Sequence, residues 1–185
     1  MTRPLVLLAV TLLAAPAVHA AAWQADGNTS TLGFIGVSQG AAFDGKFKRF
    51  KAAIEFDPAQ LASARFDVQI ELAAADTANA ERDDTLHGKD FFDVARHPTA
   101  TWTAAKVRSL GGNRYAADGT LSLRGVSKPV RLNFTWTAGA KPTLVGEAMV
   151  NRLDFNVGSG QWADTTVIGN AVTVRTNLQL APAGR

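Results

Sequence analysis

From residue 32 onward, apolar and polar residues alternate with a period of two, the pattern of β-strands with one buried and one solvent-facing side. The clearest segment is RFDVQIEL at residues 65–72, where every second residue is Phe, Val, Ile or Leu. VRLNFTW at residues 130–136 repeats the pattern. With six weaker segments, the alternation predicts eight strands, at residues 32–37, 50–57, 65–72, 99–107, 113–124, 130–136, 143–151 and 171–180.

Turn-forming residues separate most of these segments. They are DPAQ at 57–60, GGN at 111–113, GVSKP at 125–129 and AGAKP at 138–142. Short strands joined by short turns predict an all-β fold, either a sandwich or a barrel. We favour an eight-stranded antiparallel barrel, because closure removes the exposed edges that a sandwich must protect. The interior of such a barrel is either filled by side chains or holds one small ligand.

The connection between the predicted strands at 65–72 and 99–107 is the exception to the short turns. A structureless loop of this length is uncommon in a compact domain, so we expect a short helical insertion around residues 77–93. A helix over 78–87, capped by Asp76 or Thr77 and ending at Gly88, accounts for the pattern.

Two adjacent phenylalanines follow this predicted helix. Ala78, Arg82 and Leu86 lie four residues apart and therefore share one helix face. If Leu86 packs onto the barrel, Phe91 and Phe92 lie where they can close the barrel mouth.

The first twenty residues have the features of a secretory signal peptide. Arg3 precedes the apolar run PLVLLAVTLLAAPA, and VHA at 18–20 provides small residues for cleavage after Ala20. The alternative is a membrane anchor, but the run is shorter than the ~20 residues that a spanning helix needs. We therefore expect export, to the periplasm in a Gram-negative bacterium, and one mature domain over residues 21–185.

Composition narrows the possible functions. The chain has no cysteine, which excludes disulfides, thiolate metal sites and a cysteine nucleophile. Its 19 basic and 16 acidic residues are interspersed, so the sequence gives no sign of nucleic-acid binding. A length of 185 residues is typical of one domain.

Candidate catalytic and metal-binding motifs are weak. His87 and His97 lie near Asp90 and Asp93, but without a compact metal-ligand spacing. The GSG at 158–160 lacks the lysine of a phosphate-binding loop, and the sequence contains no GxSxG nucleophile motif. We therefore expect no enzyme activity, no catalytic residue, no metal and no cofactor.

Three long segments carry a family resemblance. They are ERDDTLHGKDFFDVARHPTATW at 81–102, GTLSLRGVSKPVRL at 119–132 and NRLDFNVGSGQWADTTVIGNAVTV at 151–174. In order and spacing the chain resembles the YceI-like family, bacterial secreted proteins described as polyisoprenoid-binding and lipocalin-like. The resemblance implies a lipocalin-like barrel with a hydrophobic cavity for an isoprenoid lipid, either an isoprenoid quinone or a polyprenyl lipid.

The chain departs from the family pattern at two places. Many members have a histidine where this chain reads VSQG at 37–40, and a glycine at the position of Asn156. The segments SQG, SGQW and DTTVIGN resemble those of a subgroup of the family that is found fused to, or encoded beside, cytochrome b561-type membrane haem proteins.

The resemblance favours a periplasmic binding protein that carries or sequesters the lipid. The alternative is an accessory protein of membrane electron transfer, with transient contact to the inner membrane or to a membrane cytochrome. An enzyme acting on isoprenoids is a weaker third hypothesis.

The apolar residues on the inward faces could simply fill the core. The family resemblance implies instead that they are candidate ligand contacts. The candidates are Phe34, Phe66, Val68, Ile70, Phe91, Phe92, Trp102, Leu121, Leu132, Phe134 and Phe155. Arg82, His97 and Arg152 are candidate head-group contacts, since they can donate hydrogen bonds to quinone or phosphate oxygens. The preferred alternative for Arg82 is a structural ion pair with Asp90 or Asp93, and a structural role is likewise preferred for Arg152, two residues before Asp154.

Export can be tested on the protein made by its own host. We expect the mature chain to begin at Ala21 and to fractionate with soluble periplasmic proteins, because the apolar run ends before it reaches spanning length. N-terminal sequencing of the periplasmic fraction measures this. An intact Met1 terminus in washed membranes would show that the segment is an anchor.

Overall fold

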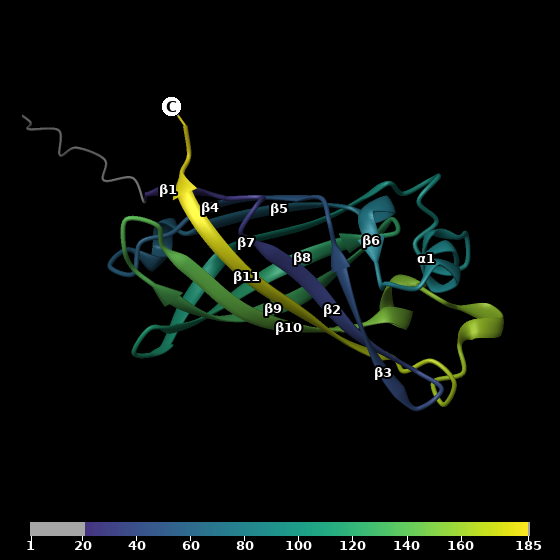
Figure 1. Ribbon diagram of the computed structural model, residues 1–185. Helices are drawn as coiled ribbons and strands as arrows, with labels where there is room; N and C mark the ends of the chain where they lie inside the picture. The colour runs from purple at the N-terminus through teal and green to yellow at the C-terminus, as the bar shows by residue number, and fades with distance from the viewer. Residues whose placement is uncertain (1–20, 185) are drawn as a thin grey trace, which may run out of the picture.

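The computed structural model describes residues 21–184, so the signal peptide expected over residues 1–20 lies outside the described part. Eleven strands are present there: β1 (Ala22–Ala25), β2 (Thr31–Ser38), β3 (Ala41–Phe47), β4 (Phe50–Glu55), β5 (Arg65–Glu71), β6 (Ala75–Asp76), β7 (Thr99–Gly111), β8 (Arg114–Leu123), β9 (Val126–Thr137), β10 (Thr143–Asn151) and β11 (Ala171–Pro182). One α-helix, α1 (Ala80–His87), and short 3₁₀ turns complete the fold (Figure 1). No helix in this part of the chain is long and apolar enough to cross a membrane.

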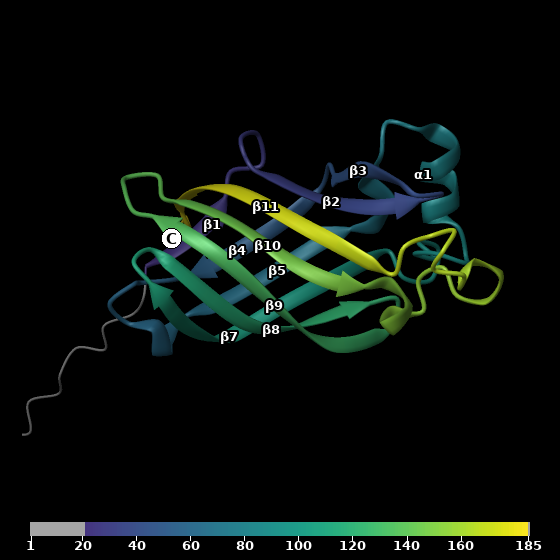
Figure 2. The same ribbon diagram turned by 90° about the horizontal axis from the view of Figure 1, so that it is seen from below.

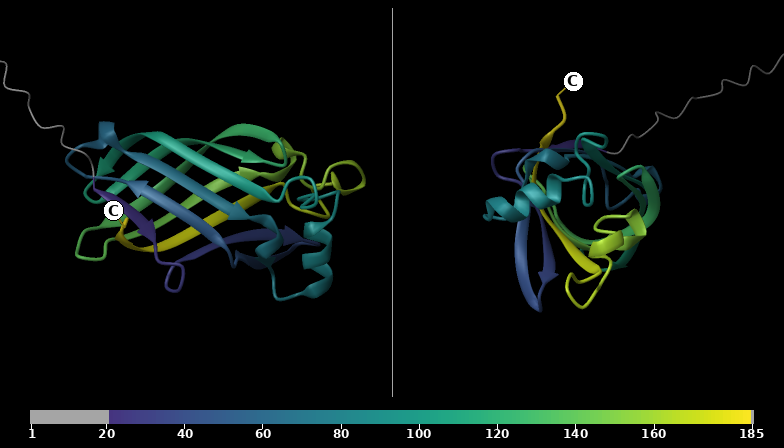
Figure 3. Two further views of the ribbon diagram at one scale, coloured as in Figure 1. Left: turned by 90° about the horizontal axis from the view of Figure 1, so that it is seen from above. Right: turned by 90° about the vertical axis from the view of Figure 1, so that its right-hand side faces the viewer.

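Eight of these strands form a closed antiparallel ring in the part of the chain that the structure describes. The order is β1, β4, β5, β7, β8, β9, β10 and β11, and β11 pairs back to β1. The end-on view in Figure 3 shows the strands arranged around one axis. The predicted eight-stranded antiparallel barrel is confirmed, and the ring has no open edge.

The remaining strands extend the wall at one end. Beyond its contact with β1, strand β11 pairs with β2 through residues 173–177, and β2 forms a hairpin with β3. Strand β3 leads into β4 and pairs with β6, which follows β5. The hairpin of β2 and β3 projects at the same end as α1 (Figures 1 and 2).

The sequence pattern did not predict the three strands β1, β3 and β6, and one turn is shorter than predicted. β1 and β6 are only four and two residues long, and the alternation of β3 is interrupted by Gly45. The turn expected at 125–129 is a tight one, with Arg124 and Gly125 at positive φ. Strand β9 already begins at Val126 and includes Pro129.

The helix begins two residues later than predicted. Asn79 is its N-cap, and its side chain accepts a hydrogen bond from the backbone of the first turn. Ala78 has a positive φ of 55° and is excluded from the helix. The predicted caps, Asp76 and Thr77, therefore lie before the turn that starts the helix. The helix ends at His87, as predicted.

An aromatic cluster fills the end of the barrel at which both described termini lie. Its central ring is Phe56, which is 1% exposed. Ring centroids lie 5.0 Å away for Tyr115, 5.5 Å for Phe134 and 4.8 Å for Trp136, all in edge-to-face arrangement. Phe66 joins the cluster at 6.2 Å. Large rings in these geometries pack tightly, so this half of the interior is a filled core.

Removing a ring from the cluster tests this assignment. We expect Phe134→Ala to lower the free energy of unfolding by about 3–5 kcal/mol, because it leaves a cavity between rings that cannot collapse. Denaturant unfolding measures the loss. Leu110→Ala, at an exposed strand position, is the control and should change stability by less than about 0.5 kcal/mol. Equal midpoints for the two variants would contradict a filled core.

Candidate functional site: an apolar cavity at the open end of the barrel

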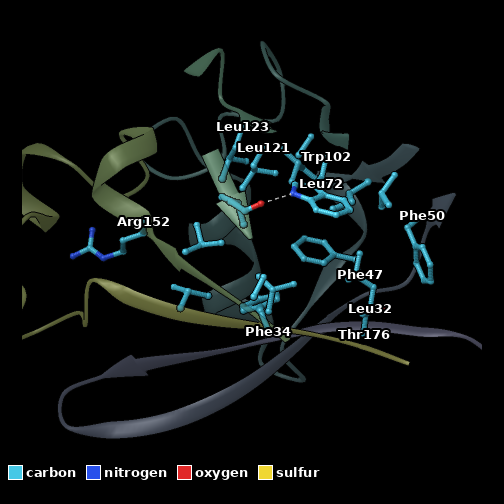
Figure 4. Close-up of a pocket in the computed structure, with 18 of the residues that line it drawn as sticks. Leu32, Phe34, Phe47, Phe50, Leu72, Trp102, Leu121, Leu123, Arg152 and Thr176 are labelled. Atoms are coloured by element: carbon cyan, nitrogen blue, oxygen red, sulfur yellow. Dashed lines mark hydrogen bonds between the residues drawn. The ribbon is translucent and has the colours of Figure 1, made fainter. Parts of the chain in front are cut away.

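The other half of the barrel encloses a cavity of about 200 Å³. It lies between the aromatic cluster and the end that carries α1, and inward-facing side chains line it (Figure 4). Among the described lining residues, only Arg152, Thr176 and Trp102 have polar side-chain groups. Trp102 Nε1 donates to the Val130 carbonyl at 3.1 Å, so its polar atom is satisfied within the wall.

Several inward-facing side chains are only half-buried. Phe47, Val68, Leu132 and Val174 point into the barrel and border the cavity, yet none is fully buried. In a filled core these positions would be covered by neighbouring side chains. They instead face unfilled apolar space, which is suited to an apolar ligand.

Most of the predicted ligand contacts line this cavity. They are Phe34, Phe66, Val68, Ile70, Phe91, Phe92, Trp102, Leu121 and Leu132. The other two, Phe134 and Phe155, do not line it. Phe134 belongs to the aromatic cluster, and Phe155 is 1% exposed but packs outside the lining. Whether the lining residues touch a ligand stays a prediction.

Sequence reasoning missed the contribution of the β2–β3 hairpin. Phe43 and Phe47 of β3 line the cavity together with Phe34 and Gly36 of β2. The Phe43 ring lies over Gly36, where an added Cβ would approach ring carbon Cζ to 2.7 Å. This glycine is needed for the ring to lie flat on the strand. The sequence does contain a strand signal here, because Phe43 and Phe47 fall on the same face of a strand. Gly45, on that face between them, interrupts the alternation of apolar and polar residues.

Two loops cover the end of the barrel and hold the adjacent phenylalanines beneath them. We call residues 88–98 and 152–170 the lid. Phe91 and Phe92 are 5% and 8% exposed, and both border the cavity. The Phe91 ring lies 5.7 Å from that of Trp162 in the second loop, and the Phe92 ring 6.3 Å from that of Phe47 in the barrel wall. The pair therefore connects the lid to the cavity.

Hydrogen bonds join the two lid loops. The Gly158 amide donates to the Asp90 carbonyl at 2.7 Å, and Trp162 Nε1 donates to the Asp90 carboxylate at 3.3 Å. Arg124, from the β8–β9 turn, donates to the Lys89 carbonyl at 2.5 Å. The lid is thus fastened both across its loops and to the barrel.

Arg152 organises the second loop from inside. It is 5% exposed, and its five guanidinium N–H groups donate to five backbone carbonyls. The acceptors are Val157, Gly158, Trp162, Ile168 and Gly169. Burial lowers the pKa of the guanidinium from its ordinary value. Figure 4 shows the side chain pointing away from the cavity. These bonds use its donors, which agrees with the structural role that the sequence favoured over a head-group contact.

Arg82 has different partners from those expected. Its Nε donates to the Thr77 hydroxyl at 3.0 Å, and its guanidinium lies 4.3 Å from the centre of the Phe43 ring. The ion pair expected with Asp90 or Asp93 is absent from the described residues. Arg82 thereby connects α1 to the β2–β3 hairpin at the edge of the cavity, without lining it.

The remaining sequence candidates lie away from the cavity. The His97 ring packs beside Gly125, where an added Cβ would lie 3.2 Å from its Cε1 atom, and it does not border the cavity. Asn156 has a left-handed φ of 56°, a conformation that glycine and asparagine tolerate best, which accounts for this departure from the family pattern. Over residues 21–184, no three His, Asp or Glu side chains are grouped as metal ligands.

Comparisons with known proteins agree with this architecture. The family model described as YceI-like domain matches residues 23–180. The chain belongs to the YceI-like family. A UPF0312 protein of Azotobacter vinelandii is 40% identical over 86 residues, covering 46% of this chain and 45% of that protein. Another from Pseudomonas savastanoi pv. phaseolicola is 31% identical over 129 residues, covering 65% and 67%. The match therefore spans less than half of the first of these relatives and about two thirds of the second.

Solved structures share the fold. Burkholderia cenocepacia BcnA aligns with a TM-score of 0.81 and 31% identity, covering 85% of this chain and 99% of that one. A polyisoprenoid binding domain from Saccharophagus degradans aligns with a TM-score of 0.69 and 16% identity, covering 88% and 99%. At 16% identity, the similarity to the Saccharophagus degradans domain shows a shared fold and nothing about function.

Replacing Arg152 tests its role in the lid. We expect Arg152→Met to lower the free energy of unfolding by at least ~3 kcal/mol and to speed amide hydrogen exchange over residues 156–170, because five carbonyls lose their donor. Arg152→Lys should recover only part of the loss, since an ammonium has three donors.

The control for this experiment is an exposed arginine with a single partner. Arg175→Met removes a surface pair with Glu147, at 2.9 Å, and should cost less than about 1 kcal/mol. Unchanged exchange in the lid of Arg152→Met would contradict the structural role.

Proposed function

We propose that this protein is a periplasmic binding protein that holds the tail of an isoprenoid lipid, an isoprenoid quinone or a polyprenyl lipid, without covalent chemistry. The observation that carries the proposal is the apolar cavity, in whose lining the Trp102 N–H is bonded within the wall and the Arg152 guanidinium is bonded to the lid. Membership of the YceI-like family and the fold shared with a polyisoprenoid binding domain support it.

The shape of the interior favours a chain over a compact ligand. The aromatic cluster blocks one end of the barrel, and the cavity extends from it to the lid. Binding in such a space relies on removing apolar surface from water, since the walls provide few hydrogen bonds. A polar head group would have to stay hydrated, so it would remain at the open end while the tail occupies the cavity.

The bound lipid identifies the function directly. Protein purified from the periplasm of its own host should carry an isoprenoid lipid, which organic extraction and mass spectrometry detect. A quinone in the extract would favour a role beside membrane electron transfer. A fatty acid, or no lipid after gentle purification, would contradict the proposal.

The phenylalanines beneath the lid test how the site holds its ligand. We expect the double change Phe91→Ala and Phe92→Ala to speed release of a fluorescent polyprenyl probe by more than its effect on the apo melting temperature would suggest. The reason is that both rings border the cavity and contact the lid.

Stopped-flow release from delipidated and reloaded protein measures this rate. Phe134→Ala is the matched control, because it removes a buried ring that does not border the cavity. It should lower the melting temperature without a comparable gain in release rate. Equal release from the wild type and the double variant would show that these rings only stabilise the fold.

A further inference from the structure

Two chain segments that form the rim of the cavity on the hairpin side contain no charged residue. We call residues 36–43, the tip of the β2–β3 hairpin, and residues 165–174, the end of the lid with the start of β11, the lip. Neither segment contains Asp, Glu, Lys or Arg. The neighbouring helix at the same end is highly charged: α1 contains Glu81, Arg82, Asp83 and Asp84, and the Arg82 guanidinium lies over the Phe43 ring at the end of the lip.

The two segments of the lip form one surface. The Gln39 amide donates to the Val167 carbonyl at 2.7 Å, and the Gly169 amide donates to the Val37 carbonyl at 2.9 Å. Ser38 and Ile168 lie between them as an isolated antiparallel bridge. These bonds join the hairpin tip to the lid and pair four backbone groups of the lip within the protein.

The cavity reaches the surface at this lip. Val37 borders the cavity and is 37% exposed, and Val167 beside it is 44% exposed. Gly36, Ile168, Gly169 and other lip residues also border the cavity. An apolar surface therefore continues from the interior to the outside of the molecule at this point.

We propose that the lip contacts the surface of a lipid bilayer of zwitterionic head groups when the ligand enters or leaves the cavity. This proposal rests on the proposed function, because an isoprenoid tail has to pass between a bilayer and the barrel. Segments without ionised side chains lose less hydration at such a contact than charged segments would.

The charges around the lip select against anionic lipids. No Lys or Arg occurs between residues 153 and 174, and Asp44 and Asp164 flank the two segments of the lip. Of the arginines beside the lip, Arg175 is paired with Glu147 at 2.9 Å, and Arg82 belongs to the mostly acidic helix α1. The Thr166 hydroxyl donates a hydrogen bond to the Asp164 carboxylate, and nearby backbone amides donate more weakly. These bonds lower the pKa of the Asp164 carboxyl, so this group stays ionised. Anionic head groups would be repelled here. Two exposed valines give only a small apolar contact, so the encounter should be brief.

A transfer experiment tests the contact. The protein is loaded with a nitrobenzoxadiazole-labelled tetraprenyl alcohol and mixed with phosphatidylcholine vesicles that contain a rhodamine lipid as quencher. We expect the transfer rate to rise in proportion to vesicle concentration and to fall when phosphatidylglycerol replaces part of the phosphatidylcholine. Val167→Asp and Val37→Asp should each slow transfer by roughly tenfold, because the added carboxylate has to stay hydrated at the interface.

The control is an aspartate at an equally exposed site far from the lip. Val145 is 50% exposed on β10, next to the buried Leu144 that pairs with Trp136 of the aromatic cluster. Val145→Asp should transfer at the wild-type rate. Val167 does not border the cavity, so Val167→Asp should still bind the probe to saturation without vesicles.

The outcomes separate the two proposals. Absence of saturable binding by the wild type would contradict the proposed function itself. Saturable binding with a transfer rate that is independent of vesicle concentration, or equal for Val167→Asp and Val145→Asp, would overturn the membrane contact alone. Transfer that the lip variants slow only with native membranes, and not with protein-free vesicles, would overturn the bilayer as partner in favour of a membrane protein.

Discussion

The pairing of β11 with β1 closes the sheet at eight strands, and this closure determines how much interior the side chains have to fill. Near the described termini, large rings fill it completely. Toward the lid, several inward positions are small residues, including Ala52, Ala100 and Ala148. The circumference is set by the ring of strands, so small residues at inward positions leave empty space. The cavity thus follows from side-chain size within a closed ring.

Closure alone would leave the open end exposed to water, and the lid depends on Arg152 to prevent this. A loop of irregular backbone folded over an apolar space has carbonyls that neither a sheet nor water satisfies. One buried guanidinium supplies five donors in fixed directions, and this compensates for removing its charge from water. The lid is consequently held by contacts within the protein, so the cavity exists before any ligand arrives.

The alternation of apolar residues predicted most of the wall, because inward and outward positions differ in sequence wherever one face is dry. Alternation does not report how far along the barrel axis a residue lies. Leu132 and Phe134 share an inward face two residues apart, yet Leu132 borders the cavity and Phe134 lies in the filled end. The hydrogen-bond partners of Arg152 could not be predicted from the sequence pattern either. They depend on the path by which the loop of residues 156–170 folds back around the Arg152 side chain. Gly45 interrupted the alternation in β3, so the sequence did not identify Phe43 as an inward-facing residue.

A site built almost entirely from apolar walls has a specific consequence for selectivity. For the proposed isoprenoid tail, each buried methylene would contribute about 0.8 kcal/mol, so affinity would grow with the length of tail inside the barrel. Discrimination between tails that differ by one methylene is limited to about 1–3 kcal/mol in such a pocket. If the proposed tail fills the cavity, the aromatic cluster would stop it at one end, and added length would have to emerge at the lip. The length that is buried would then be limited by the distance between Phe66, where the cavity meets the cluster, and Val37 on the rim, and the head group would contribute to recognition only outside the barrel.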